Sequence, residues 1–91
     1  MKDHADNRGK GDLPMNLDRL HTTDLGVERI KKNLSLDAAI DVVGWCRDIM
    51  KDPNSEWVRR GKNWYIQTDD CIITVNAFSD TIITAHKRKK Q

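Results

Sequence analysis

The last third of the chain alternates between apolar and polar residues, and this alternation constrains the fold more than any other feature. From Gly61 to Lys87 the sequence reads GKNWYIQTDDCIITVNAFSDTIITAHK. Successive side chains of a β-strand point to opposite faces, so a period of two indicates strands with one apolar and one polar face. We predict three short strands here, separated by turns at Asp69-Asp70 and at Ala77 to Asp80.

The parity of each position assigns these residues to two faces of the predicted sheet. The largely apolar set is Trp64, Ile66, Cys71, Ile73, Val75, Thr81, Ile83 and Ala85. The complementary set is Asn63, Tyr65, Gln67, Ile72, Thr74, Asn76, Ile82, Thr84 and His86. The apolar face can pack on helices, whereas the other face gathers Tyr, Gln, Thr, Asn and His side chains. We take this second face as the candidate functional site.

Two helical patterns precede the strands. Either Thr22 or Thr23 can cap the first helix. Its apolar stripe consists of Val27, Ile30 and Leu34, which recur at helical spacing.

The second helical pattern follows directly, and either Ser35 or Asp37 can cap it. Pro53 disfavours helical geometry at the residue before it, so this helix should end near Lys51. Its apolar positions are Ala39, Ile40, Val43, Cys46, Ile49 and Met50.

The hydrophobic period changes from that of a helix to that of a strand at Ser55. The stretch from Ser55 to Arg60 predicts a first strand, and Gly61-Lys62 predicts a hairpin turn into the strands described above. Two helices followed by four consecutive strands indicate an α+β fold. We expect both helices to pack on one face of a four-stranded antiparallel meander.

The length of 91 residues allows one small domain. Residues 1–14 are polar, so we expect a disordered extension there, followed by the domain at residues 15–87 and a basic tail at residues 88–91. No run is apolar enough for a transmembrane helix or a signal peptide, which predicts a cytoplasmic protein with no membrane partner. The three His and two Cys match no metal-ligand spacing, so we expect no metal and no cofactor. Cys46 and Cys71 should be buried, reduced thiols.

The polar face has residue types suited to metal-independent cleavage of a phosphodiester. This reaction needs a proton acceptor, a proton donor and cations around the phosphate. His86 is the candidate acid or base because imidazole titrates near neutral pH. Tyr65 could carry the second proton or stack on a base, while Thr84 and Asn76 could position the substrate.

Several basic residues could hold the phosphate. The candidates are Arg29, Arg59 (with Arg60 as its alternative), Lys62, Lys87 and Arg88. The basic run from Lys87 to Lys90 could add affinity for RNA by releasing counterions from phosphates. An ordinary surface role is the alternative throughout: His86 could hydrogen-bond within the sheet, Tyr65 could cover its edge, and the arginines could be solvated. A polar outer face is itself expected of a two-layer fold.

Three stretches resemble a small bacterial family of unknown function. They are a T-x-L-G-x-x-R-I-x-x-N-L helix, a G-K-N-W-Y strand and a terminal I-I-T-A-H-K strand, and the match extends from about Leu20 to Lys87. The resemblance implies no activity, because the function of the family is not known.

A more distant resemblance rests on the order of the elements. Short helices bearing an Arg, followed by a four-stranded sheet whose last strand reads I-x-T-x-H, are similar to barnase, colicin D, colicin E5 and the RelE toxins. Those proteins are metal-independent ribonucleases that cut RNA across the exposed face of the sheet. The resemblance implies RNA as the substrate and a protein antitoxin or inhibitor as a possible partner. This sequence places no glutamate base on the candidate face, so His86 would have to work with Tyr65 and basic groups.

Two other functions remain open from the sequence. The same face and tail could bind RNA or DNA without cleaving it. Alternatively, the chain could be a protein-interaction or antitoxin-like regulatory domain that contacts a partner through a sheet edge or through Trp57 and Phe78.

Overall fold

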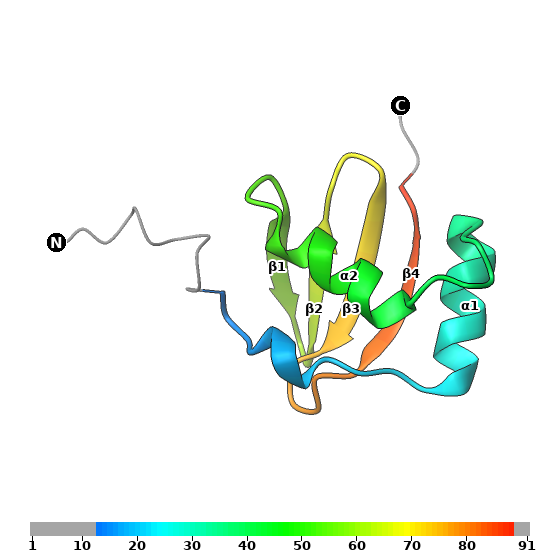
Figure 1. Ribbon diagram of the computed structural model, residues 1–91. Coiled ribbons are helices and arrows are strands. Elements are labelled where there is room, and N and C mark those ends of the chain that lie inside the picture. The colour runs from blue at the N-terminus through cyan, green and yellow to red at the C-terminus, as the bar shows by residue number, and fades with distance from the viewer. Residues whose placement is uncertain (1–12, 89–91) are drawn as a thin grey trace, which may run out of the picture.

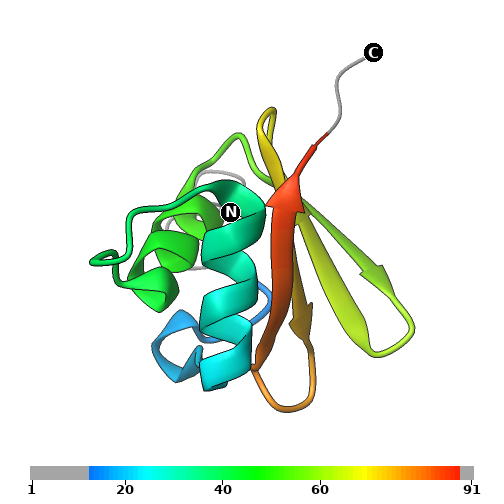
Figure 2. The same ribbon diagram turned by 90° about the vertical axis from the view of Figure 1, so that its right-hand side faces the viewer.

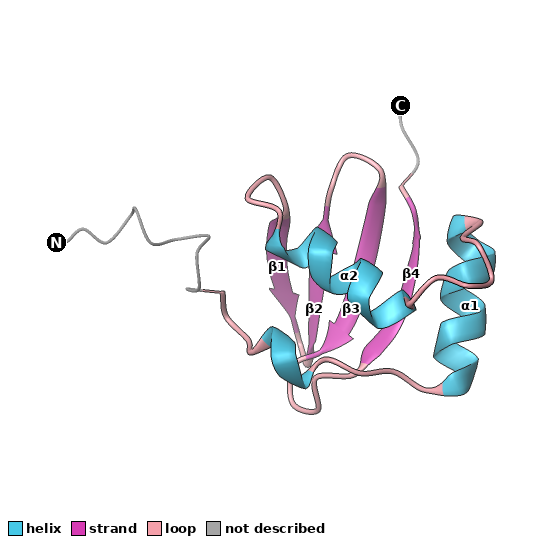
Figure 3. Cartoon of the chain, in the orientation of Figure 1, coloured by secondary structure: helices cyan, strands magenta, loops and turns pink. Residues whose placement is uncertain are grey.

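The computed structural model describes residues 13–88, in which two helices precede an antiparallel sheet (Figure 1; Figure 3). After a 3₁₀ turn at Leu17–Arg19, the elements are α1 (Asp24–Leu34), α2 (Val42–Lys51), β1 (Glu56–Arg60), β2 (Asn63–Gln67), β3 (Cys71–Asn76) and β4 (Ile82–Lys87). The predicted α+β fold with a four-stranded meander is confirmed.

Helix α1 begins where the sequence predicts. The Thr23 hydroxyl accepts a hydrogen bond of 3.0 Å from the backbone N–H of Gly26, which satisfies one of the free donors of the first turn. Ile30 and Leu34 are buried, so the predicted stripe faces the core. The helix ends at Leu34 because Ser35 adopts a left-handed conformation, with a φ of 57°.

Helix α2 begins later than the sequence predicts. The Asp37 carboxylate accepts a hydrogen bond of 2.9 Å from the Ala39 N–H, which stabilises a local turn in place of a helix start. Ala39 and Ile40 therefore lie in the connection, and the helix starts at Val42. Its end at Lys51 is the one predicted from the following proline.

The strands pair in sequence order, each antiparallel to the next. Residues 61–62 form the turn between β1 and β2, where Gly61 takes a φ of +58° that glycine adopts without strain. Residues 69–70 form the next turn, and the Thr68 N–H closes it with a hydrogen bond of 2.9 Å to the Cys71 carbonyl. The predicted turns are confirmed.

The two helices lie on the same side of the sheet but in different positions. Helix α2 crosses the face formed by β1, β2 and β3, whereas α1 runs alongside β4 at the edge of the sheet (Figure 1; Figure 2). The face opposite α2 is thereby left without a helical layer in the described part of the chain.

Helix α1 and the segment before it cover the outer edge of β4. The His21 carbonyl accepts a hydrogen bond of 2.7 Å from the Ile82 N–H, and the Thr22 hydroxyl donates one of 2.7 Å to the Ile82 carbonyl. Farther along the strand, the Asn33 side chain donates to the Ala85 carbonyl at 3.2 Å. An edge strand with free backbone groups can pair with other chains, so these contacts protect β4 from such pairing.

The core lies between the helices and the inner face of the sheet. Its most deeply buried apolar side chains are Ile30, Cys46, Met50, Ile66, Ile73, Val75, Ile82 and Ala85. Trp57 and Trp64 extend it toward β1, with ring centroids 5.6 Å apart in an edge-to-face arrangement. Leu13, in the predicted extension, also packs against the core. Residues 1–12 of that extension and residues 89–91 of the predicted tail lie outside the described residues.

A β-bulge between β3 and β4 changes the predicted parity of β4. Val75 is opposite Ile82, whereas the preceding residue of β3 is opposite Thr84, so Ile83 is the extra residue. Ile82 is consequently buried, and Ile83 is 36% exposed. The prediction that Ile83 faces the helices and Ile82 faces away from them is wrong. Positions after the bulge keep their predicted faces.

Candidate functional site

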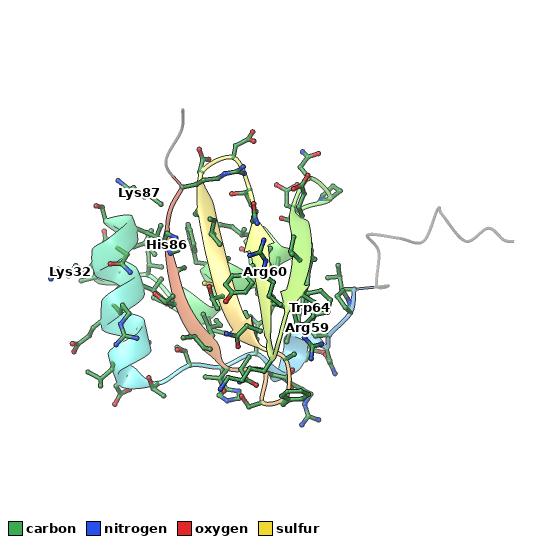
Figure 4. All side chains as sticks on the ribbon, turned by 180° about the vertical axis from the view of Figure 1, so that it is seen from behind. Lys32, Arg59, Arg60, Trp64, His86 and Lys87 are labelled. Atoms are coloured by element: carbon green, nitrogen blue, oxygen red, sulfur yellow. The ribbon has the colours of Figure 1, made fainter. Side chains whose placement is uncertain are left out.

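The face of the sheet turned away from α2 is the candidate site, and we call it the open face (Figure 4). The strand registers place on it Glu56, Val58, Arg60, Asn63, Tyr65, Gln67, Ile72, Thr74, Asn76, Thr84 and His86. Helix α1 borders it on the β4 side. The four predicted catalytic residues, Tyr65, Asn76, Thr84 and His86, therefore share one face. Glu56 lies on this face too, at its β1 edge, so the expectation of a face without a glutamate is wrong.

A row of directly paired residues crosses the middle of the open face, namely Val58, Tyr65, Thr74 and Thr84. Thr74 is only 7% exposed because Tyr65 and Thr84 flank it from the neighbouring strands. Tyr65 is half-buried, and its hydroxyl forms no hydrogen bond with any described residue. The Thr84 hydroxyl lies 3.5 Å from the side-chain nitrogen of Asn33 on α1. The row thus presents one aromatic ring with two threonine hydroxyl groups on its β4 side.

His86 lies near the end of β4, opposite Ile72, with an exposed side chain. Its imidazole forms no hydrogen bond within residues 13–88. Tyr65 is two strands away and two residues along, which separates the two Cα atoms by about 12 Å. Tyr65 and His86 therefore lie on the same face without being neighbours in the strand register. Whether both reach one phosphate depends on the directions of their side chains, so their joint role as proton carriers stays a prediction.

Asn76 is a turn residue. Its side-chain oxygen accepts hydrogen bonds from the backbone N–H groups of Phe78, at 2.8 Å, and Ser79, at 3.0 Å. This Asx turn fixes the connection between β3 and β4. Only the amide nitrogen of the Asn76 side chain is therefore left for the predicted role in positioning a substrate.

The two adjacent arginines of β1 point to opposite faces. The Arg59 guanidinium lies 5.5 Å from the Trp64 ring centroid and 5.4 Å from that of Phe78, on the helix side of the sheet. Arg59 therefore does not serve the open face, which corrects that prediction. Arg60, the alternative to Arg59, is opposite Asn63 and lies on the open face (Figure 4).

The predicted cations after His86 lie at the end of the sheet. Lys87 is opposite Cys71, so strand alternation directs it to the helix side. The Arg88 guanidinium donates a hydrogen bond of 3.0 Å to the Thr68 carbonyl at the β2–β3 turn. Neither cation joins His86 on the open face.

The other two predicted phosphate ligands border the open face at different corners. Arg29 lies one turn before Asn33 on α1, and Asn33 contacts β4, so Arg29 borders the β4 side of the face. Lys62 is exposed in the turn between β1 and β2, beside Arg60.

A cavity of about 550 Å³ lies on the other side of the sheet, and we did not predict it. It is lined by Leu34, Trp45, Ile49, Asp52, Thr68, Asp70, Cys71, Lys87 and Arg88. These residues come from α1, α2, the β2–β3 turn and the end of β4. These residues are far apart along the chain, so the sequence does not indicate the cavity. The alternation of the strands could have placed Lys87 and Cys71 on the same face.

Both cysteines are buried free thiols, as predicted. Burial raises the pKa of the Cys46 thiol to about 12. Burial also raises the pKa of the Cys71 thiol, against the lowering effect of a hydrogen bond with Thr68. The thiolate is the nucleophilic form, so neither cysteine is suited to nucleophilic catalysis. Within the described residues, no group of three or more His, Cys, Asp or Glu could hold a metal ion.

Comparison with known proteins identifies a family. A family model described as a protein of unknown function (DUF3781) matches residues 15–86. No curated protein and no solved structure matched the chain. The resemblance to a family of unknown function is confirmed over these residues, whereas the resemblance to ribonucleases stays a hypothesis. Within residues 13–88, no helix has the length and apolar character needed to span a bilayer.

Proposed function

The chain belongs to this family of unknown function, and we propose that its open face binds single-stranded RNA. The observation behind this proposal is the layout of that face, where Tyr65 lies at the centre among short hydrogen-bonding side chains. Proteins bind single-stranded RNA by stacking its bases on aromatic rings and by hydrogen bonds to the base edges. Each stacked base contributes about 1–3 kcal/mol to affinity.

Hydrogen-bonding groups that could contact the bases surround Tyr65. Gln67 and Thr84 lie on the same face. The side-chain oxygen of Asn63 is buried and has no hydrogen-bond partner among the described residues. Because this oxygen is inaccessible to solvent, a bound base could not reach it, so Gln67 and Thr84 are the side chains that would contact the base edges.

Cations at two borders of the open face supply phosphate contacts in this proposal. Arg60 lies on the β1 side, and Arg29 lies on α1 beside β4. Each cation that neutralises a phosphate releases condensed counterions, so the affinity should fall steeply as salt increases.

A binding titration tests the proposal with a matched pair of aromatic substitutions. A labelled single-stranded RNA is titrated with the full chain, with Tyr65→Ala and with Phe78→Ala. Phe78 is 77% exposed but lies against Arg59, away from the open face. We expect Tyr65→Ala to weaken binding by about fivefold to a hundredfold and Phe78→Ala to leave it unchanged. Absence of RNA binding, or equal affinity of the wild type and Tyr65→Ala, would contradict the proposal.

Ribonuclease activity of the toxin type is the second candidate function, and the exposed imidazole of His86 is the observation that favours it. A neutral imidazole free of other hydrogen bonds can accept the proton of a ribose 2′-hydroxyl. A cation would then have to stabilise the charge on the phosphate, and Arg29 on α1 is the candidate that borders the β4 side of the face. In this case a protein antitoxin or inhibitor would be the expected partner.

Incubation of total RNA with the purified chain in EDTA tests this second function. Cleavage that His86→Ala abolishes, with RNA binding retained, would support a metal-independent ribonuclease. Absence of cleavage, or cleavage that His86→Ala leaves intact, would rule out His86 as its acid or base while leaving the binding proposal to its own titration.

A further inference from the structure

The two edges of the sheet differ in how they are covered. Helix α1 and the segment around His21 cover β4, whereas β1 ends the strand order on the opposite side (Figure 1). Within residues 13–88, no backbone hydrogen bond or strand pairing reaches the outer side of β1. An edge of this kind presents backbone groups that can pair with another strand.

The hydrogen-bond alternation identifies the groups of β1 that point outward. The Thr68 N–H bonds across to β3, so alternate residues of β2 direct their backbone groups to β3, and Tyr65 directs its groups to β1. Val58, the partner of Tyr65, therefore bonds inward. The N–H and C=O groups of Trp57 and Arg59 then point away from the sheet.

The side chains of β1 make this edge complementary to itself. We propose that a second copy of the chain pairs antiparallel with β1 about a two-fold axis at Val58. Glu56 then lies opposite Arg60 of the second copy, and Arg60 lies opposite Glu56 of the second copy. A strand with a single sign of charge would repel its own copy, whereas opposite charges directly across a strand pair attract.

The other face of β1 is complementary about the same axis. Trp57 lies opposite Arg59 of the second copy, an arrangement that favours a cation–π contact. Arg59 is already oriented by its contacts with Trp64 and Phe78. Trp57 and Arg59 also carry the outward backbone groups, so they form the hydrogen-bonded pairs and Val58 forms the closer, non-hydrogen-bonded pair at the centre.

This pairing would join the two sheets into one continuous sheet. Because the axis is perpendicular to the sheet, the two open faces lie side by side. The row that contains Tyr65 and Val58 then continues directly into the same row of the second copy. The proposal does not depend on RNA, and its test contains none.

Disulfide crosslinking tests the register. In Val58→Cys, each new thiol lies opposite its own counterpart, with Cα atoms about 4.5 Å apart, which is within the range of about 4.4–6.8 Å that disulfides span. We expect a covalent dimer under mild oxidation. The native thiols are buried, so the wild type under the same conditions should give no crosslink.

Two further variants are matched controls on the same strand. Glu56→Cys alone and Arg60→Cys alone each separate the paired thiols by about 14 Å, so neither should form a dimer. A mixture of Glu56→Cys and Arg60→Cys brings the two thiols opposite each other and should form a heterodimer. Crosslinking of Glu56→Cys alone as efficient as that of Val58→Cys would overturn the proposed register.

Sedimentation of the chain without introduced cysteines gives an independent readout. We expect a monomer–dimer equilibrium in the wild type and a shift toward monomer in Arg60→Glu, where like charges face each other. Combining Glu56→Arg with Arg60→Glu should restore the dimer. A wild-type chain that stays monomeric at every attainable concentration, or a charge swap that fails to restore dimerisation, would overturn the proposal.

Discussion

The side-chain amide of Asn33 donates a hydrogen bond of 3.2 Å to the carbonyl oxygen of Ala85 and so ties α1 to the outer edge of β4. This carbonyl points away from β3, where it would otherwise be an unpaired acceptor of an edge strand. The contact holds α1 beside the sheet instead of beneath it. Helix α1 thereby borders the open face, while β1 is left as the uncovered edge.

Replacing Asn33 by Ala should destabilise the fold by up to about 1 kcal/mol. The lost hydrogen bond is worth about 0.5–1.5 kcal/mol, and the higher helix propensity of Ala offsets part of that loss. Lys32→Ala is the control, because Lys32 is the neighbouring exposed residue of the same helix. Urea unfolding measures both variants. Equal stability of the two variants would contradict the role assigned to Asn33.

The bulge in β4 predicts different costs for two adjacent isoleucines. Ile82→Ala should lower the free energy of unfolding by about 2–5 kcal/mol, because it leaves a cavity in the core. Ile83→Ala should cost less than about 1 kcal/mol, because Ile83 lies on the open side. Denaturant unfolding of the two variants gives the comparison. A larger loss for Ile83→Ala would contradict the bulge and would support an uninterrupted alternation along β4.

The sequence predicts the order and type of the elements because helical and strand periods differ clearly along the chain. It does not reveal the bulge, because Ile82 and Ile83 are chemically identical and their faces are set by hydrogen-bond register. The start of α2 was also wrong, since Ser35 and Asp37 can either begin a helix or form the turns that they form here. Local propensity alone does not separate these roles.

The residues of the candidate site also fall into those that the sequence predicts and those that it does not. Alternation brings Tyr65, Thr84 and His86 to one face, because the odd residue of the bulge precedes Thr84. Asn76 carries no sequence signal that separates a turn residue from a binding residue. The choice between Arg59 and Arg60 depends on strand register, which the hairpin turn sets.

Burial of Cys46 predicts that stability decreases in alkaline solution. The pKa of this thiol is about 12 in the fold against 9.0 when unperturbed, so the unfolded chain loses its proton first as pH rises. Stability is therefore fully present below pH 9.0 and falls between there and the folded pKa, by at most about 1.4 kcal/mol per pH unit.

Urea unfolding of the wild type and Cys46→Ala on both sides of pH 9.0 measures this contribution. The wild type should lose more stability with rising pH than Cys46→Ala, because the two chains differ only in the thiol of residue 46. Identical pH slopes would show that the Cys46 proton does not contribute to folding stability.

The adjacent residues Arg60 and Arg59 offer the most direct test of the open face as an RNA-binding surface. Both carry the same charge and belong to β1. Arg60 lies on the open face, whereas Arg59 lies against Trp64 and Phe78. RNA affinity is measured for Arg60→Ala and Arg59→Ala at several salt concentrations, with the protein dilute enough to be monomeric. We predict that Arg60→Ala weakens binding and lowers the salt dependence by about one phosphate contact, while Arg59→Ala changes neither. Equal losses in both variants, or a loss confined to Arg59→Ala, would contradict the assignment of RNA binding to the open face.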